Sequence, residues 1–279
     1  MTHFIRTFLL RLRMALALLA LGAVLAGCAK DIPVFIPPAE RPADAVNQPW
    51  PSGRLLALAY HAVEDKAPNQ AYLGVRTDRL IEQLAWLRES GYQAVSVDQI
   101  LAARNGGAPL PPRAVLLTFD DGYRSFITRV FPVLKAYQWP FVIAPVGQWL
   151  DTPADQPVDF GGLPSPREMF MTWDDVREMA RSPLVEVGAH TDGLHHGVTA
   201  NPQGNQQPAA TTLIYDAKAG RYETPAAYEA RVGRDVQAIN RKVREAAGKP
   251  PRVWVWPYGE ASGAAMRIVG EQGYSIALT

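Results

Sequence analysis

The 279-residue sequence has only one cysteine, Cys28, and almost no net charge. A single cysteine cannot form a disulfide within the chain, so in an exported protein its thiol needs another use. A formal net charge of +1 gives no reason to expect nucleic acid as a partner, and it predicts no strong attraction to a polyanion. The sequence also contains no internal repeat.

The apolar run near the N-terminus, residues 14–26, is too short and too early for a membrane-spanning helix. Three arginines precede it, and a basic segment followed by an apolar one is typical of a signal peptide. Its end, Leu25-Ala-Gly-Cys28, resembles a bacterial lipobox, which implies cleavage before Cys28 and a lipid on the thiol. The alternative is an unmodified cysteine in an ordinary signal peptide. We therefore read residues 1–28 as a lipoprotein signal peptide.

The residue after the cysteine bears on the destination of the protein. Ala29 is not the aspartate that resembles an inner-membrane retention signal, so we expect a periplasm-facing outer-membrane lipoprotein. Residues 29–52 are rich in proline and alanine and predict an extended tether. The remaining residues, 53–279, have the length of one domain.

Apolar, β-rich runs alternate with amphipathic helical patterns along this domain. The runs are Leu55–His61, Gln93–Val97, Ala114–Phe119, Phe141–Val146, Leu184–Ala189, Arg252–Trp256 and Tyr274–Leu278. There are four helical patterns. The first ends at Gly91, the second follows Thr172, the third ends at Gly248 and the fourth ends at Gly273. Thr77 or Asp78 is expected to cap the first helix and Thr172 the second. This alternation predicts an α/β fold with a parallel sheet and outer helices, and seven or eight such units make a closed or nearly closed barrel.

Chemically reactive side chains stand where the expected strands end. Asp120 and Asp121 end one apolar run, and His190 ends another. Adjacent carboxylates repel each other, so a divalent cation or a shared proton usually explains such a pair. One carboxylate with two imidazoles is a catalytic metal set that leaves coordination positions for water. The alternative for either aspartate is to cap a helix that begins near Ser125.

Two long polar segments, residues 151–167 and 197–224, leave the same face of the expected barrel. Long loops at a barrel mouth usually shape a substrate groove, and disorder is the alternative.

Three segments together resemble the polysaccharide deacetylases of carbohydrate esterase family 4. Thr118-Phe-Asp-Asp-Gly122 is identical to the first family motif, and His190-Thr-Asp-Gly-Leu-His195 is one residue longer than the second. Trp254-Val-Trp-Pro-Tyr-Gly259 resembles the Arg-Pro-x-Tyr-Gly loop. With the early Leu58-Ala-Tyr-His61 segment, the order is closest to the poly-β-1,6-N-acetyl-D-glucosamine deacetylases of biofilm export systems.

This resemblance implies a distorted (β/α) barrel of about seven strands, the NodB-like polysaccharide deacetylase fold, in a circularly permuted form. Members of the family have residues beyond the last strand, and the biofilm enzymes carry a second, glycoside-hydrolase-like domain there. We therefore expect the domain in residues 53–279 to be truncated at its C-terminus.

The resemblance also implies a role for each candidate residue. Asp121, His190 and His195 would bind the metal, and Asp120 would be the general base. His61 would be the general acid, and the backbone N–H of Tyr258 would bind the oxyanion. Trp254 and Trp256 alternate on a strand, so one of them could face the sugar; Trp256 is the candidate, with core packing as the alternative.

Several alternatives stay open at this level. His196 competes with His195 as the second imidazole, and we prefer His195 because the Asp192-Gly193 turn can bring it back beside His190. Asp192 could instead accept a hydrogen bond from an imidazole N–H. His61 could be a hydrogen-bonded core histidine, and Tyr258 could lie in an ordinary turn. The family's loop arginine has no equivalent, because Val255 or Trp256 stands in its place, so another group must tune Asp120.

The expected activity is hydrolysis of the N-acetyl amide bonds of poly-β-1,6-N-acetyl-D-glucosamine during export of a biofilm polysaccharide. Two imidazoles with one carboxylate suit zinc, cobalt or nickel better than calcium or magnesium, which prefer oxygen ligands. The expected partners are the polymer, the outer membrane and an export porin. The alternatives are a peptidoglycan or chitin deacetylase, an O-acetyl esterase, and a non-catalytic glycan-binding lipoprotein.

Overall fold

The structure, a computed structural model, describes Trp50, Pro51 and residues 53–279. The expected signal peptide, the lipobox with Cys28, and the tether apart from Trp50 and Pro51 lie outside the described residues. No helix in the described part of the chain is long and apolar enough to cross a membrane.

Parallel strands form the centre of the domain. They are β1 (Leu55–Tyr60), β4 (Gln93–Ala94), β5 (Ala114–Asp121), β6 (Phe141–Pro145), β9 (Val185–Val187), β14 (Val253–Val255) and β15 (Ile276–Leu278). The sheet order is β1-β5-β6-β9, and β4 pairs with the start of β5. A parallel bridge between Ala189 and Trp254 joins β9 to β14, which pairs with β15. Each apolar run of the sequence therefore contains a strand.

The row of strands curls into an open barrel. Ala57 and Ala59 of β1 line the same cleft as Leu278 of β15, so the two ends of the row face each other. No ladder joins β1 to β15 among the described residues, so the barrel is open on that side. The α/β class with a parallel sheet is confirmed, and the arrangement of the strands is consistent with the expected distorted barrel.

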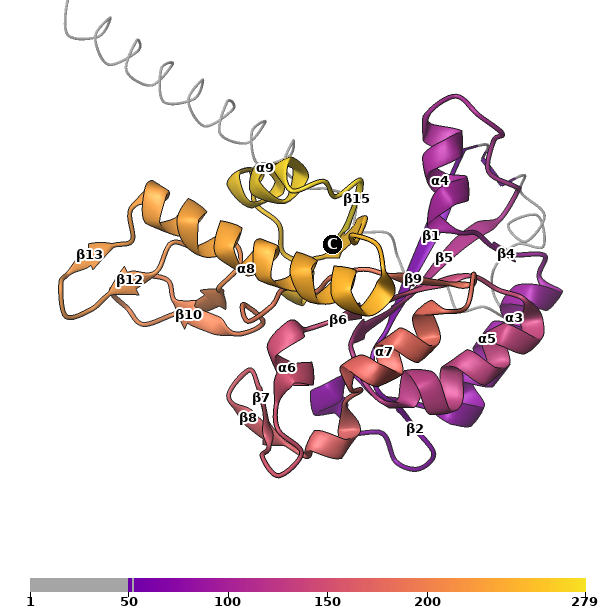
Figure 1. Cartoon of the computed structure of the whole chain (residues 1–279), viewed down its shortest axis with the longest axis horizontal. Helices are drawn as coiled ribbons and strands as arrows, with labels where there is room; N and C mark the ends of the chain where they lie inside the picture. Colours follow the sequence, from indigo (N-terminus) through magenta and orange to yellow (C-terminus); the bar gives the residue numbers. More distant parts are fainter. Residues whose placement is uncertain (1–49, 52) are drawn as a thin grey trace, which may run out of the picture. The chain divides into compact units, whose positions relative to one another are not determined.

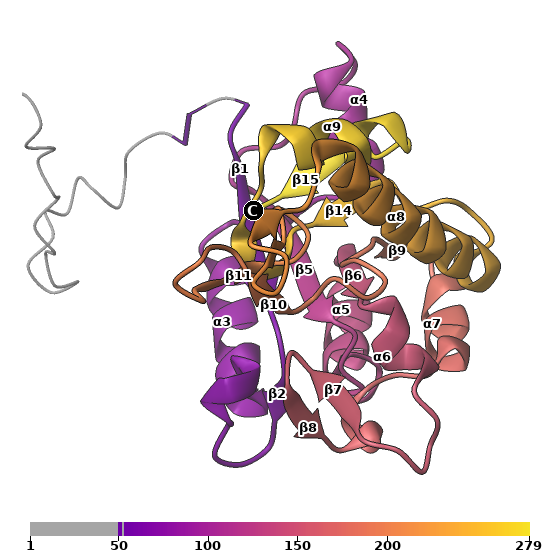
Figure 2. The same cartoon turned by 90° about the vertical axis from the view of Figure 1, so that its left-hand side faces the viewer.

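Helices cover the outside of the strands, with α3, α5, α7 and α8 following one another around them (Figures 1 and 2). The helices are α3 (Thr77–Glu89), α4 (Val97–Arg104), α5 (Phe131–Tyr137), α6 (Gly147–Asp151), α7 (Trp173–Ala180), α8 (Pro225–Ala247) and α9 (Gly263–Glu271). Short helical turns lie at Gln70–Tyr72, Phe126–Val130, Arg167–Met169 and Pro257–Gly259.

Most expected helix ends are confirmed, and two local predictions are wrong. Thr172 caps α7 in a reciprocal capping box, and α8 ends at Gly248 in the left-handed conformation. Neither Thr77 nor Asp78 caps α3, because the Thr77 hydroxyl donates to Asp65 and the Asp78 carboxylate pairs with Arg76. Val97 begins helix α4 instead of ending a strand, because Ser96 and Gln99 form a capping box there.

Short strands organise the connecting segments. They are β2 (Val63–Glu64) with β3 (Val75–Arg76), β7 (Val158–Phe160) with β8 (Leu163–Ser165), β10 (Gly197–Thr199) with β11 (Gln206–Pro208), and β12 (Tyr215–Asp216) with β13 (Arg221–Tyr222). The two long polar segments are therefore folded into hairpins, and disorder is the wrong alternative for them.

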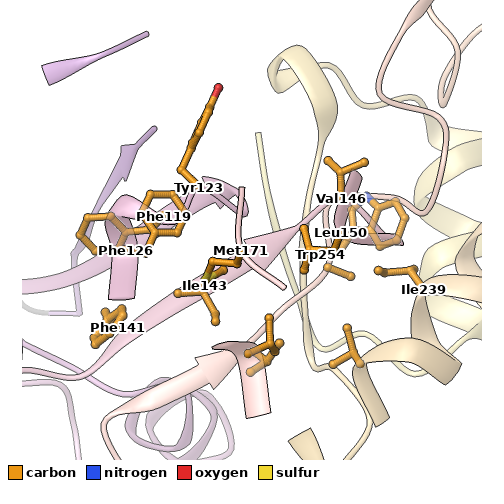
Figure 3. Close-up of a cluster of buried hydrophobic side chains, with 14 of the residues drawn as sticks. Phe119, Tyr123, Phe126, Phe141, Ile143, Val146, Leu150, Met171, Ile239 and Trp254 are labelled. Carbon is orange, nitrogen blue, oxygen red and sulfur yellow. The ribbon is translucent and has the colours of Figure 1, made fainter. Parts of the chain in front are cut away.

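A core rich in aromatic side chains fills the space between strands and helices (Figure 3). The ring of Phe119 on β5 lies 5.4 Å from the ring of Phe126 and 5.6 Å from that of Phe141. Ile239 of α8 and Trp254 of β14 belong to the same cluster. Burying a side chain of this kind stabilises the fold by about 1.5–3 kcal/mol. The strands that carry the candidate residues are therefore anchored in a well-packed hydrophobic core.

Candidate active site

A cleft of about 680 Å³ lies at the C-terminal ends of the parallel strands. In β/α barrels this end carries the chemistry. The residues selected from the sequence line it together: His61, Asp120, Asp121, His190, His195, Trp256 and Tyr258. Leu73, Phe160 and Leu163 add apolar wall, the last two from the β7–β8 hairpin. No residue of the second polar segment, 197–224, is among the described residues that line the cleft, so only the first segment shapes it as expected.

Asp120 and Asp121 end β5 and are both buried. Successive side chains of a strand normally point to opposite faces, yet both carboxylates line the same cleft. The backbone explains this, because Asp121 has a φ of 74° and Gly122 follows with a φ of 83°. A left-handed residue without glycine's freedom costs about 1–3 kcal/mol and is typical of functional sites.

His190 leaves β9 with its ring orientation set by a hydrogen bond. Its Nδ1–H donates to the carbonyl of Val255 over 2.8 Å, because a carbonyl can only accept. The other nitrogen, Nε2, lies 3.4 Å from Oδ1 of Asp121. In the neutral imidazole with its proton on Nδ1, Nε2 carries a free lone pair, and this is the tautomer that can bind a metal through Nε2.

His195 brings a second imidazole to the same carboxylate oxygen. Its Nε2 also lies 3.4 Å from Oδ1 of Asp121. The ring is held between aromatic neighbours, with centroids 4.8 Å from Trp149 and 4.7 Å from Tyr258. His196 points elsewhere, because its Nδ1–H donates to the carbonyl of Gly193 over 3.0 Å. The structure therefore places His195, and not His196, beside His190 and Asp121.

The three side chains fit a divalent metal ion. The ligand atoms of Asp121, His190 and His195 lie within 4.8 Å of one another. Oδ1 of Asp121 is buried and accepts no hydrogen bond from any described residue, so none of these residues competes with a metal ion for it. One carboxylate and two imidazoles with room in a cleft form the open donor set of a catalytic metal. Within the described residues, this is the cluster of three such groups that could hold an ion.

The neighbours of the two aspartates shift their pKa values in opposite directions. Burial raises the pKa of Asp120 to about 6, although the charges of His190 and His61 act against it. Burial also acts to raise the pKa of Asp121, but the facing imidazoles of His190 and His195 outweigh it and hold this pKa below its usual value. Burial and the nearby His190 lower the pKa of His195 to about 4. His195 is therefore a neutral imidazole at neutral pH, as a metal ligand must be.

His61 and Tyr258 both line the cleft. His61 directly follows β1 and lines the cleft, where its charge acts on Asp120. Tyr258 has a φ of 59°, and its backbone N–H meets no acceptor among the described residues. Trp254 and Trp256 both belong to the hydrophobic core, as the core-packing alternative expects, and Trp256 also lines the cleft.

The structure bears on three further points that the sequence left open. Neither aspartate caps the helical turn after Ser125, which has no side-chain cap. Asp192 is not a partner of an imidazole; its carboxylate pairs with Lys242 of α8. No arginine of the described residues contacts Asp120, and the positive groups that act on it are His190 and His61.

Sequence reasoning missed three polar residues near the site, of which Tyr123 is buried and Asp235 and Lys242 are partly buried. Tyr123 is 1% exposed, its hydroxyl has no partner among the described residues, and burial and the Asp121 charge raise its pKa. Asp235 and Lys242 of α8 contact the turn between the two histidines. Both stand on the apolar stripe of α8, at helical spacing from Val232 and Ile239, and this misplaced charge is the signal that could have revealed them.

Comparison with known proteins gives consistent matches. The sequence pattern of the polysaccharide deacetylase family matches residues 107–277. The poly-β-1,6-N-acetyl-D-glucosamine N-deacetylase of Escherichia coli strain K12 is 49% identical over 245 residues, which is 88% of this chain and 36% of that protein. This chain thus spans little more than a third of the length of the Escherichia coli relatives.

Two solved structures are similar along most of the described domain. The de-N-acetylase of Aggregatibacter actinomycetemcomitans has a TM-score of 0.75 at 42% identity, covering 80% of this chain and 86% of that one. The BpsB deacetylase domain of Bordetella bronchiseptica has a TM-score of 0.72 at 41% identity, covering 81% of this chain and 87% of that one.

Proposed function

Because the chain belongs to the polysaccharide deacetylase family, we propose that it is a metal-dependent N-deacetylase of poly-β-1,6-N-acetyl-D-glucosamine. The observation that carries the proposal is the cluster of Asp121, His190 and His195 beside a second buried carboxylate, Asp120, in one cleft. The polymer is inferred from the Escherichia coli relative, which is named for this activity and is 49% identical. Its biological setting would be the export of a biofilm polysaccharide.

The residues of the cleft supply the groups that amide hydrolysis needs. Asp121, His190 and His195 would hold a divalent ion, and that ion would supply Lewis acidity for polarising a carbonyl and acidifying a water molecule. Asp120 accepts the proton of the attacking water, and its raised pKa suits a base near neutral pH. The N–H of Tyr258 donates to the oxyanion of the tetrahedral intermediate. His61 protonates the leaving amine, so the products are acetate and a glucosamine unit.

We further propose that the metal is zinc, cobalt or nickel. Two imidazole nitrogens and one carboxylate oxygen suit these borderline cations, whereas calcium and magnesium prefer oxygen donors.

The proposed location is the periplasmic face of the outer membrane. The supporting features are the basic and apolar segments before residue 27, the lipobox-like Leu25–Cys28, and alanine at position 29. An export porin is the proposed partner at that location.

Replacement of the proposed base tests the function. Asp120→Asn keeps the shape of the side chain but cannot accept a proton, so acetate release should fall by a factor of about 10² to 10⁴. The metal content should stay at the wild-type value, because Asp120 is not one of the three clustered ligands. Asp155→Asn is the control, because it makes the same change in net charge at an exposed position. Near-normal acetate release by Asp120→Asn would contradict the mechanism.

The substrate is tested with the wild-type chain. Acetate release is measured from β-1,6-linked and β-1,4-linked N-acetylglucosamine oligomers side by side. We expect faster release from the β-1,6 oligomers. Faster release from the β-1,4 oligomers would favour a chitin or peptidoglycan deacetylase, and a chain that takes up no divalent ion would favour a non-catalytic binder.

A further inference from the structure

The turn between the two clustered histidines has an unfavourable backbone. Thr191 has a φ of 71° and is fully buried, and its hydroxyl has no partner among the described residues. A β-branched residue in the left-handed region is a true outlier, and it persists only where the surroundings hold it. His190 directly precedes this residue, so the position of Thr191 decides where the first imidazole points.

The start of helix α6 holds the turn on one side. The N–H of Gly147 donates to the carbonyl of Thr191 over 3.1 Å, and the N–H of Gln148 donates to the carbonyl of Asp192 over 2.8 Å. The packing is close, because a Cβ at Gly147 would lie 2.1 Å from Oδ1 of Asp192. A Cβ at Gly193 would likewise lie 2.5 Å from the side chain of Gln148.

Helix α8 holds the turn on the other side through a single carboxylate. Oδ2 of Asp235 accepts from the N–H of Asp192 over 2.9 Å, and Oδ1 accepts from the N–H of Gly193 over 2.7 Å. Two helical turns later, Lys242 pairs with the carboxylate of Asp192 and with that of Asp151. The carbonyls of the turn thus face α6, and its N–H groups face Asp235.

The identity of the residue at position 235 needs a reason beyond packing. Its neighbours on the same stripe of α8 are Val232, Val236 and Ile239, all buried. An apolar side chain there would extend the core, whereas the partly buried carboxylate of Asp235 carries a desolvation cost that specific hydrogen bonds must offset. The hydrogen bonds that Asp235 accepts come from the turn that carries the histidines.

We propose that Asp235 is a positioning residue for the metal site, an inference that rests on the proposed function. Its carboxylate holds the Thr191–Gly193 turn so that His190 and His195 present their Nε2 atoms to the same oxygen of Asp121. Groups that orient metal ligands in this way typically change metal affinity by about 10- to 100-fold when they are removed. Lys242 assists by holding the side chain of Asp192.

Cobalt binding to the purified full-length chain tests this role. The dissociation constant for Co²⁺ and the visible absorption spectrum of the bound ion are measured for wild type, Asp235→Asn and Asp235→Ala. Asp235→Ala should bind Co²⁺ about 10- to 100-fold more weakly, with a shifted spectrum. Asp235→Asn keeps one acceptor oxygen and should fall between wild type and alanine. Glu245→Ala, an exposed carboxylate on the same helix, should match wild type in both readouts.

The spectrum separates positioning from stability, because it reports the geometry of the ligands and not the amount of folded protein. Wild-type affinity and spectrum in Asp235→Ala would overturn the proposal. If that variant does not fold, Lys242→Met and Gly147→Ala disturb the same turn from α8 and α6, and wild-type cobalt binding in both would overturn it equally. A wild-type chain that binds cobalt but releases no acetate contradicts the proposed activity alone, whereas one that binds no cobalt contradicts both.

Discussion

Two adjacent aspartates acquire different properties from their neighbours. Asp121 faces the imidazoles of His190 and His195, so its ionised form is favoured. Asp120 lacks such close partners, and burial raises its pKa to about 6. The same residue type at successive positions is therefore suited to metal binding in one case and to proton transfer in the other.

At the residue scale, the choice between His195 and His196 is directly testable. Alanine at Asp121, His190 or His195 should weaken metal binding by more than about 100-fold, because loss of a ligand exceeds the effect of losing its supporting group. His196→Ala should keep both metal and activity, since its Nδ1–H is bound to Gly193 instead. Metal content and acetate release measured on the four variants check this. Loss of metal in His196→Ala with retention in His195→Ala would reverse the assignment.

The pH dependence of stability should carry the signature of Asp235. Burial raises its pKa from 3.8 to about 6, and the hydrogen bonds from Gly193 and Asp192 and the charge of Lys242 offset this only in part. Between these two values the folded chain holds a proton that the unfolded chain has lost, so the free energy of unfolding falls as pH rises through this window. This contribution is complete below about pH 4 and is lost above about pH 6.

Asp235→Asn removes the titrating group and is the matched comparison. Its free energy of unfolding relative to wild type should rise from pH 4 to pH 6 and then stay level. Urea unfolding of both proteins across this range, with a chelator present, measures the difference. A difference that does not vary with pH would show that Asp235 does not titrate in this window.

At the scale of elements, α8 links the candidate site to the two hairpins, β10–β11 and β12–β13, that lie between His195 and α8 in the chain. Its stripe of apolar residues packs on the core, while Asp235 and Lys242 reach the turn between the histidines. In the N-terminal half of α8, Arg231 binds residues of the segment 209–223, which contains the β12–β13 hairpin. Its guanidinium donates to the carbonyls of Ala209 and Thr212 and to the carboxylate of Glu223.

Arg231→Met should therefore loosen the segment 209–223. The change leaves the carboxylate of Glu223 and two carbonyls without their donor, and because the pair is only partly buried we expect a loss of about 2–3 kcal/mol in the free energy of unfolding. Chemical denaturation measures the loss, and hydrogen exchange should rise in residues 209–223. Arg234→Met, an exposed position on the same helix, should change stability by less than about 0.5 kcal/mol. Unchanged exchange in the segment would contradict this role of Arg231.

At the scale of the whole molecule, the polysaccharide deacetylase domain and the N-terminal 49 residues pose separate questions. The domain from Trp50 onward contains every residue proposed to act on the substrate. The segment before it carries the proposed anchor, and its single cysteine makes the test simple.

Cys28→Ser should release the protein from the membrane fraction, because the lipid would have no thiol to join. Intact mass measurement of the wild-type protein should show cleavage before Cys28 and the added mass of a lipid. Ala29→Asp should keep the lipid but move the protein to the inner membrane. A wild-type protein found in the soluble fraction without added mass would refute the anchor.

The sequence by itself determined the fold class and the candidate ligands, because these depend on local patterns. The apolar runs that end in Asp120-Asp121 and in His190 each predict a buried strand and identify the residues at its C-terminal end. This prediction needs no information from the rest of the chain. The same local patterns failed where a contact from a distant part of the chain decides: Thr77 donates to Asp65 instead of capping α3, and Asp192 pairs with Lys242 instead of an imidazole.

Only the tertiary structure shows which histidine lies beside His190 and Asp121, and what holds it there. The rings of Trp149 and Tyr258, far apart in sequence, enclose His195, while His196 turns to the nearby carbonyl of Gly193. Asp235 reaches the turn from 42 residues away. Hydrogen bonds and ring contacts of this kind depend on how helices, strands and loops pack together, and the spacing of residues in the sequence does not predict that packing.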